Sequence, residues 1–124
     1  MDTIGLNFSI GGYFGGYQYL SITKTESGVQ AAYTPPHGDP DAQAIEKNFS
    51  FEEWIGFVHD LYRCNINDWK GKYVDPDILD GTQWELQVNF SKRKPLKIHG
   101  SNMFPPHWHK LLNVLKKYGL PNMK

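Results

Sequence analysis

Polar and apolar residues alternate without interruption between Thr82 and Phe90, and this stretch carries the clearest pattern in the chain. The even positions hold Trp84, Leu86, Val88 and Phe90, whereas the odd positions hold glutamine, glutamate and asparagine. Successive side chains of a strand point to opposite faces, so the pattern predicts a strand with one buried face and one wet face. The rest of the chain must then cover the apolar face.

Four segments before residue 50 also have the composition of strands. Alternating apolar positions predict the first strand at 4–10, and aromatic and β-branched residues predict the next two at 17–25 and 29–34. A short fourth strand is predicted at 44–49. Paired glycines allow positive φ at low steric cost, so the segment 11–16 is interpreted as a turn or a bulged connection.

Two helices are predicted, one in the middle of the chain and one near its end. Ser50 and Glu53 have the spacing of a capping box, which predicts that the first helix begins there. Its apolar stripe is predicted from helical spacing to contain Trp54, Ile55, Val58, Leu61 and Tyr62. The second helix is predicted to begin at Phe104-Pro105-Pro106, capped by Ser101 or Asn102, and to end before Gly119.

These elements predict one α+β domain over residues 1–124 with the order β-β-β-(β)-α-β-β-α. A strand at 96–99 would follow the central strand, and residues 65–80 are predicted to be a packed connection because they carry several apolar residues. We predict an antiparallel sheet of about five to six strands with two helices packed on one face, which buries every apolar stripe.

Composition and charge limit the possible classes of protein. The chain has 124 residues, of which 40% are hydrophobic and 15% aromatic, and a single cysteine, Cys64, which cannot form an internal disulfide. We therefore predict a folded cytoplasmic protein with no membrane segment. The total charge is zero, but residues 1–62 hold two lysines against eight acidic residues, and residues 63–124 hold eleven basic against five. The basic cluster at 92–97 is interpreted as a solvated turn, and binding of nucleic acid is not predicted.

Three motifs resemble the pattern of a family of small uncharacterised bacterial proteins. They are Trp69-Lys70 with Tyr73, the segment Asp80-Gly81-Thr82-Gln83-Trp84-Glu85-Leu86, and Gly100-Ser101-Asn102 followed by Phe104-Pro105-Pro106 and Trp108. The resemblance extends over about residues 51–118, and the turn at 91–95 departs from it because it lacks a glycine. It implies a bacterial or phage-related cytoplasmic protein and implies no activity.

The histidines do not have the spacing of a metal site. His107 and His109 lie two positions apart, so on a helix their rings would point about 200° from each other, whereas helical ligands are spaced by three or four. Asp80 and His99 would suit an acid–base pair. Asp80-Gly81 is also explained as turn chemistry. We predict no catalytic set, no metal and no cofactor.

Aromatic residues are denser near the N-terminus than one sheet face requires, and such residues favour protein interfaces. We therefore predict a non-enzymatic module that engages another protein, in the manner of an inhibitor or an immunity protein. The alternative is a small enzyme or ligand-binding domain with a pocket near Asp80, His99, Asn102 and His107. The candidate binding residues are Tyr13, Phe14, Tyr17, Tyr19, Asp80, Trp84, His99, Asn102 and His107.

Overall fold

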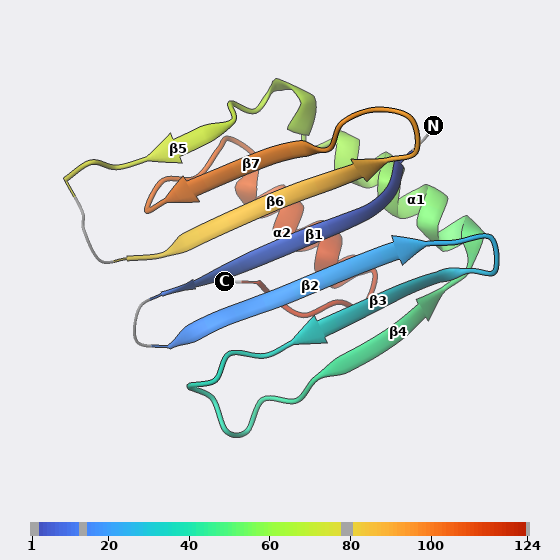
Figure 1. Ribbon diagram of the computed structural model, residues 1–124, viewed down its shortest axis with the longest axis horizontal. Helices are drawn as coiled ribbons and strands as arrows, with labels where there is room; N and C mark the ends of the chain where they lie inside the picture. Colours follow the sequence, from blue (N-terminus) through green and yellow to red (C-terminus); the bar gives the residue numbers. More distant parts are fainter. Residues whose placement is uncertain (1–2, 13–14, 78–80, 124) are drawn as a thin grey trace.

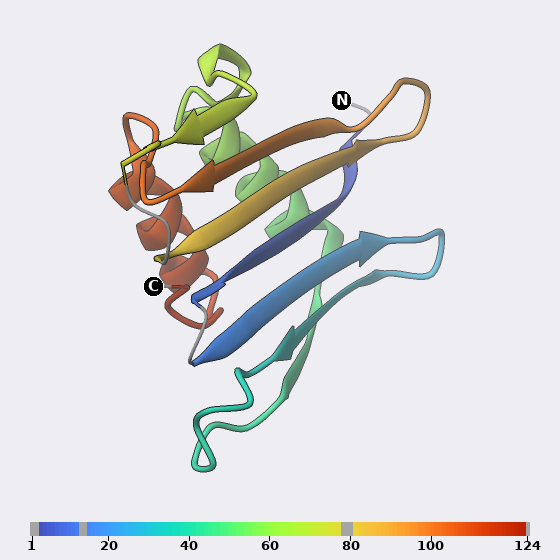
Figure 2. The same cartoon turned by 60° about the vertical axis from the view of Figure 1, so that its left-hand side comes forward.

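A computed structural model describes residues 3–12, 15–77 and 81–123. Within them, seven strands form one sheet in the order β4-β3-β2-β1-β6-β7-β5, and two α-helices lie on one side of it (Figures 1 and 2). The elements are β1 (Thr3–Gly12), β2 (Gly16–Lys24), β3 (Val29–Thr34), β4 (Ile45–Phe49), α1 (Phe51–Tyr62), the 3-10 turn η1 (Ile66–Asp68), β5 (Lys72–Val74), β6 (Gln83–Phe90), β7 (Leu96–Ser101) and α2 (Trp108–Lys117). The α+β class and the helices on one face are confirmed.

The alternating stretch forms β6, next to the central strand β1. Phe8 of β1 pairs with Leu86 of β6, and Ile10 pairs with Trp84, so the apolar side chains of both strands share the helix-covered face. A bulge between Thr3 and Gly5 shifts the register at the start of β1. Such a bulge inserts one unpaired residue, and Ile4 is accordingly only half-buried.

The sheet is mixed and has seven described strands, so the prediction of an antiparallel sheet of about five to six strands is only partly correct. The additional strand is β5, in the segment that was predicted to be a connection, and it pairs in parallel with β7. Its middle residue, Tyr73, lies beside Gly100 of β7 and places its ring 6.2 Å from that of Trp84 on β6. A three-residue strand is too short for an alternation to be detected. Its pairing with β7 and its ring contact with Trp84 both depend on residues that are distant in sequence.

The predicted start of α1 is confirmed, but the prediction that Ile55 belongs to its apolar stripe was wrong. Ser50 Oγ accepts a hydrogen bond from the Glu53 N–H, and the Glu53 carboxylate accepts one from the Ser50 N–H, each at 3.0 Å. Ile55 is 66% exposed, whereas Phe57 is fully buried against the sheet. The buried stripe therefore lies around Trp54, Phe57 and Leu61.

The second helix begins later than predicted and without the predicted cap. Its first residue is Trp108, and His107 precedes it with φ of 67° and no side-chain capping bond. A proline disfavours helical φ and ψ in the residue before it. Phe104 and Pro105 each precede a proline, so both stay outside the helix. Asn102 instead accepts a hydrogen bond from the Thr82 N–H at 2.8 Å, and this fastens β7 to the start of β6.

Within the described part of the chain, neither helix has the length and apolar character needed to cross a membrane.

Candidate functional site

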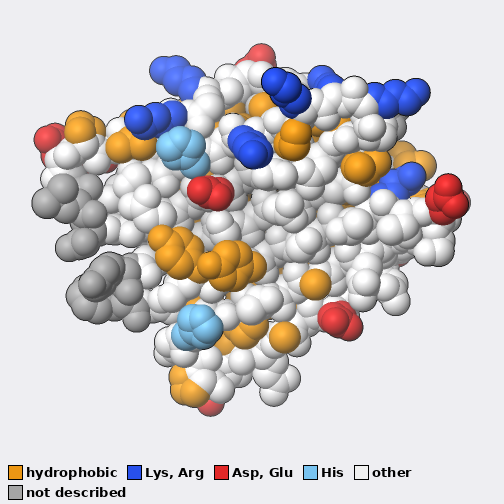
Figure 3. All heavy atoms as spheres, in the orientation of Figure 1, with side chains coloured by type: hydrophobic (Ala, Val, Ile, Leu, Met, Phe, Trp, Pro, Cys, Tyr) orange, Lys and Arg blue, Asp and Glu red, His pale blue; other side chains and the backbone are white. Residues whose placement is uncertain are grey.

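The face of the sheet opposite the helices is uncovered. Figure 3 looks onto it and shows a largely uncharged surface, a small group of apolar side chains near its middle, and lysine and arginine side chains along the edge where Figure 1 draws β5 and β7. On the central strands β2, β1 and β6, Glu85 is the one described open-face residue with a charge. The face therefore offers hydroxyl and amide groups together with two tyrosines.

A hollow of about 310 Å³ lies near the middle of this open face. One row of paired residues crosses it from strand to strand: Ser9 of β1 pairs with Tyr19 of β2 on one side and with Glu85 of β6 on the other, and Glu85 pairs in turn with His99 of β7. Paired residues on one face of a sheet are direct neighbours. The small Ser9 side chain leaves the floor low, and the larger side chains on the flanking strands form the walls.

Gly11, two residues after Ser9 on the same face of β1, makes room for the Tyr17 side chain. A Cβ atom there would lie 2.7 Å from the Cα and 2.9 Å from Cδ1 of Tyr17, which is closer than such contacts can be. The glycine thus lets the Tyr17 ring lie across the central strand. The Tyr17 and Tyr19 ring centroids are 6.3 Å apart, so the two rings form one aromatic wall. A second hollow of about 280 Å³ shares Ser9, Tyr19 and Glu85 and extends the depression along β1.

Two polar side chains of the hollow, those of Glu85 and His99, are free to bind a partner. The side chains of Glu85 and His99 form no hydrogen bond or ion pair with any described residue, although the two residues are neighbours across β6 and β7. A carboxylate, an imidazole and two phenols supply both donors and acceptors. Tyr19 is 51% exposed, so its ring already lies at the surface that a partner would cover.

The structure brings together three of the residues predicted from the sequence as binding side chains. Tyr17, Tyr19 and His99 line the same hollow. Trp84 contributes its strand position but not its side chain, because its indole is 1% exposed and points to the helix side. The predicted residues Tyr13, Phe14 and Asp80 lie outside the described part of the chain.

The remaining two predicted residues lie elsewhere. Asn102 has a structural role in this fold, because its backbone N–H and its side-chain oxygen both bond to Thr82. His107 lines a different hollow on the helix side of the sheet, whereas His99 faces the open side. The alternative pocket with both histidines is therefore not formed as one site. Among the described residues, no three histidine, cysteine or acidic side chains are grouped so that they could hold a metal ion.

Ser9, Gln83 and Glu85 belong to the hollow but were not among the predicted binding residues. The alternation in β6 did predict that Gln83 and Glu85 face solvent. No pattern in the sequence indicated that β1 would lie between β2 and β6, and this order alone brings Ser9 between Tyr19 and Glu85.

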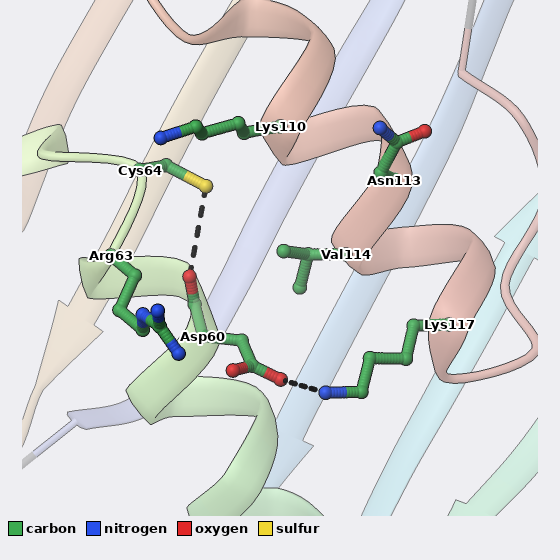
Figure 4. A pocket seen from close by; sticks show the side chains of 7 residues that line it. All are labelled: Asp60, Arg63, Cys64, Lys110, Asn113, Val114 and Lys117. Carbon is green, nitrogen blue, oxygen red and sulfur yellow. Dashed lines mark hydrogen bonds and ion pairs between the residues drawn. The ribbon is translucent and has the colours of Figure 1, made fainter.

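A groove of about 280 Å³ separates the two helices on the other side of the molecule (Figure 4). Cys64 is buried there, and its thiol donates to the Asp60 carbonyl oxygen at 3.6 Å. Burial raises the pKa of the Cys64 thiol, so the reactive thiolate is disfavoured. This geometry is that of a small packed side chain and does not favour Cys64 as a nucleophile.

Asp60 joins the two helices across this groove. Lys117 Nζ and the Tyr118 hydroxyl both donate to Asp60 Oδ2, each at 2.8 Å. The hydrogen bond from Lys117, followed by that from Tyr118, lowers the pKa of Asp60 below its ordinary value of 3.8. Burial, and then the nearby carboxylate, raise the pKa of Tyr118 to about 12. Both hydrogen bonds therefore persist at neutral pH.

Replacing Tyr118 with phenylalanine is expected to raise the pKa of Asp60 and to lower the free energy of unfolding by about 0.5–1 kcal/mol at pH 7. A carboxyl group whose pKa is lowered by folding stabilises the fold at pH values above its pKa in the unfolded chain. This contribution is lost as the pH falls through the pKa of the folded protein. The difference between the two proteins should therefore shrink below about pH 4. Urea unfolding at a series of pH values measures this difference.

Tyr62→Phe is the matched control, because the Tyr62 hydroxyl bonds to Thr3 Oγ1 at 3.1 Å with no carboxylate involved. Its cost should not vary with pH between 3 and 7. The same pH dependence in both variants would contradict the assigned role of Asp60.

Comparison with known proteins supplies no assignment for this site. No protein-family model matches the sequence, and no curated protein matches it significantly. The resemblance carried by the motifs at 69–73, 80–86 and 100–108 therefore stays a prediction.

Proposed function

We propose that this chain is a small non-enzymatic binding module that engages another protein through the open face of its sheet. The observation that carries the proposal is the uncovered hollow on the central strands, where Tyr17 and Tyr19 form an aromatic wall beside the free Glu85 and His99 side chains. Tyrosine is enriched among residues that dominate the energy of protein interfaces, because one side chain supplies both apolar area and a hydroxyl.

The chemistry of the face favours a protein over a nucleic acid as its partner. Nucleic-acid binding depends on lysine and arginine that contact phosphates. Here the central strands carry amides and hydroxyls, and Glu85 would repel a phosphate. The basic side chains lie at the β5–β7 edge instead (Figure 3). Binding through the open face should therefore depend little on salt. An inhibitor or immunity protein of a bacterium or phage, acting in the cytoplasm, belongs to this class.

A pull-down from bacterial lysate with matched variants tests the proposal. The wild-type protein is expected to retain one partner near stoichiometry at low and moderate salt. Replacing Tyr17 and Tyr19 together with serine should weaken retention by roughly tenfold or more, since two interface tyrosines would be lost. Ile55→Ser is the control, because Ile55 is an exposed apolar side chain on α1, away from the hollow.

Far-UV circular dichroism would confirm that all three proteins remain folded. Retention of the same partner by the double variant would refute the proposal. Loss of the partner by the Ile55→Ser variant alone would also refute it. Retention that disappears at moderate salt would point to the basic edge instead of the open face.

A further inference from the structure

A larger hollow lies on the helix side of the sheet, where α2 begins, and the open-face proposal does not use it. Its volume is about 600 Å³, within the range of ordinary small-molecule sites. Ile10 of β1, Trp108 and Leu112 of α2, and Phe104 of the preceding loop supply apolar surface to it. Of these, Ile10, Trp108 and Leu112 also belong to the buried core, so the hollow extends inward from the surface to the core.

The aromatic wall of this hollow is fixed in position. The Phe104 ring lies 4.9 Å from that of Trp108 and is stacked at 6.3 Å on Trp84. The Trp84 indole is itself held by a hydrogen bond from Nε1 to the Met103 carbonyl oxygen at 2.9 Å. Phe104 is nevertheless 41% exposed, and so an apolar surface held in place by packing is left open to solvent. An apolar ligand would remove that surface from water without any rearrangement.

The charged and titratable groups around this hollow are all basic. His107, His109 and Lys110 line it, and no acidic residue among those described does so. Lys110 lines both this hollow and the groove between the helices, where Figure 4 shows its side chain extending toward Cys64. It forms no hydrogen bond or ion pair with a described residue. A compact, flexible ammonium group of this kind is free to pair with a carboxylate. The potential at the rim therefore favours a negatively charged ligand.

We infer that this hollow binds a small amphiphilic anion, with an apolar chain or ring against Phe104 and Trp108 and a carboxylate at Lys110. Apolar burial supplies most of the affinity, and the basic rim selects an acid over the corresponding neutral molecule. The site is independent of the open face, since the two hollows share no lining residue and lie on opposite sides of the sheet.

Titration of the ¹⁵N-labelled protein with decanoate and with decanol, followed by amide and indole resonances, tests this inference. Both molecules have the same chain, and only the first carries a charge. Decanoate is expected to produce saturable shifts at Thr82, His109, Leu112 and the Trp108 indole, and to bind about two- to fivefold more tightly than decanol. Shifts confined to other surfaces, or no saturation at millimolar ligand, would overturn the inference.

Two variants separate the apolar contribution from the charge. Phe104→Ala should weaken both ligands about tenfold, because each loses the same apolar contact. Lys110→Glu should remove the preference for decanoate and leave decanol unchanged. Lys116→Glu, the same charge change on the same helix at a residue that does not line the hollow, is the control. Equal effects of the two lysine variants on decanoate would show that overall charge, and not this site, sets the preference.

Discussion

Replacing Gly100 with alanine is expected to lower the free energy of unfolding by about 2–4 kcal/mol, the combined cost of overpacking and of a displaced buried hydrogen bond. A Cβ at this position would lie 2.2 Å from Nε1 and 2.4 Å from Cε2 of Trp84. The indole therefore lies directly on the Gly100 backbone, its partner across β6 and β7. No rotation of a terminal group can relieve this clash, so the ring itself must move.

Moving the Trp84 ring would disturb the centre of an aromatic cluster. Its centroid lies 4.6 Å from that of Trp108, and its other neighbours are Tyr73 of β5 and Phe104. Displacement would also break the hydrogen bond from Nε1 to the Met103 carbonyl oxygen. The expected loss of stability is therefore accompanied by weaker attachment of β5 and of the loop before α2.

Urea unfolding followed by circular dichroism measures the effect, with Gly28→Ala as the control. A Cβ at Gly28, between β2 and β3, meets no atom within 4 Å, so this variant should change stability by less than about 0.5 kcal/mol. Adding Trp84→Phe to Gly100→Ala should cost less than the sum of the single changes, because the smaller ring leaves room for the methyl group. Strict additivity, or equal effects at Gly100 and Gly28, would contradict the proposed contact.

Local sequence patterns predicted those structural features that depend only on residues close together in the chain. The alternation at 83–90 identified the buried face of β6, and the Ser50–Glu53 pair identified the start of α1, because strand alternation and capping bonds act within a few residues. The same reasoning could not predict β5, which depends on Gly100 and Trp84, distant in sequence. It also could not place α2, whose start is set by two prolines and a left-handed His107.

The candidate site was partly predictable for the same reason. The polar face of β6 and the surplus of tyrosines were visible in the sequence, and both contribute to the open-face hollow. The position of Ser9 in the hollow was not visible in the sequence, because it depends on the strand order β2-β1-β6. The alternative prediction placed His99 and His107 in one pocket, yet the two residues line separate hollows on opposite sides of the sheet.

Helical spacing assigned Ile55 to the core of α1, and the geometry instead assigns Phe57, two residues further along. The Phe57 ring is fully buried and lies 5.7 Å from Trp54, 6.2 Å from Phe49 on β4 and 5.4 Å from Tyr118 after α2. It therefore joins α1 to the sheet edge and to the second helix. Ile55 points to solvent and has no comparable role.

Phe57→Ala is accordingly expected to lower the free energy of unfolding by about 3–5 kcal/mol, the usual cost of deleting a buried aromatic ring. Ile55→Ala should change it by less than about 0.5 kcal/mol, because an exposed side chain is lost and alanine favours helix. Phe57→Leu, expected to cost about 1.5 kcal/mol, keeps the comparison measurable if the alanine variant does not fold. Urea unfolding of the three variants decides between the two residues: similar losses for the two alanine variants would mean that α1 is rotated relative to the sheet.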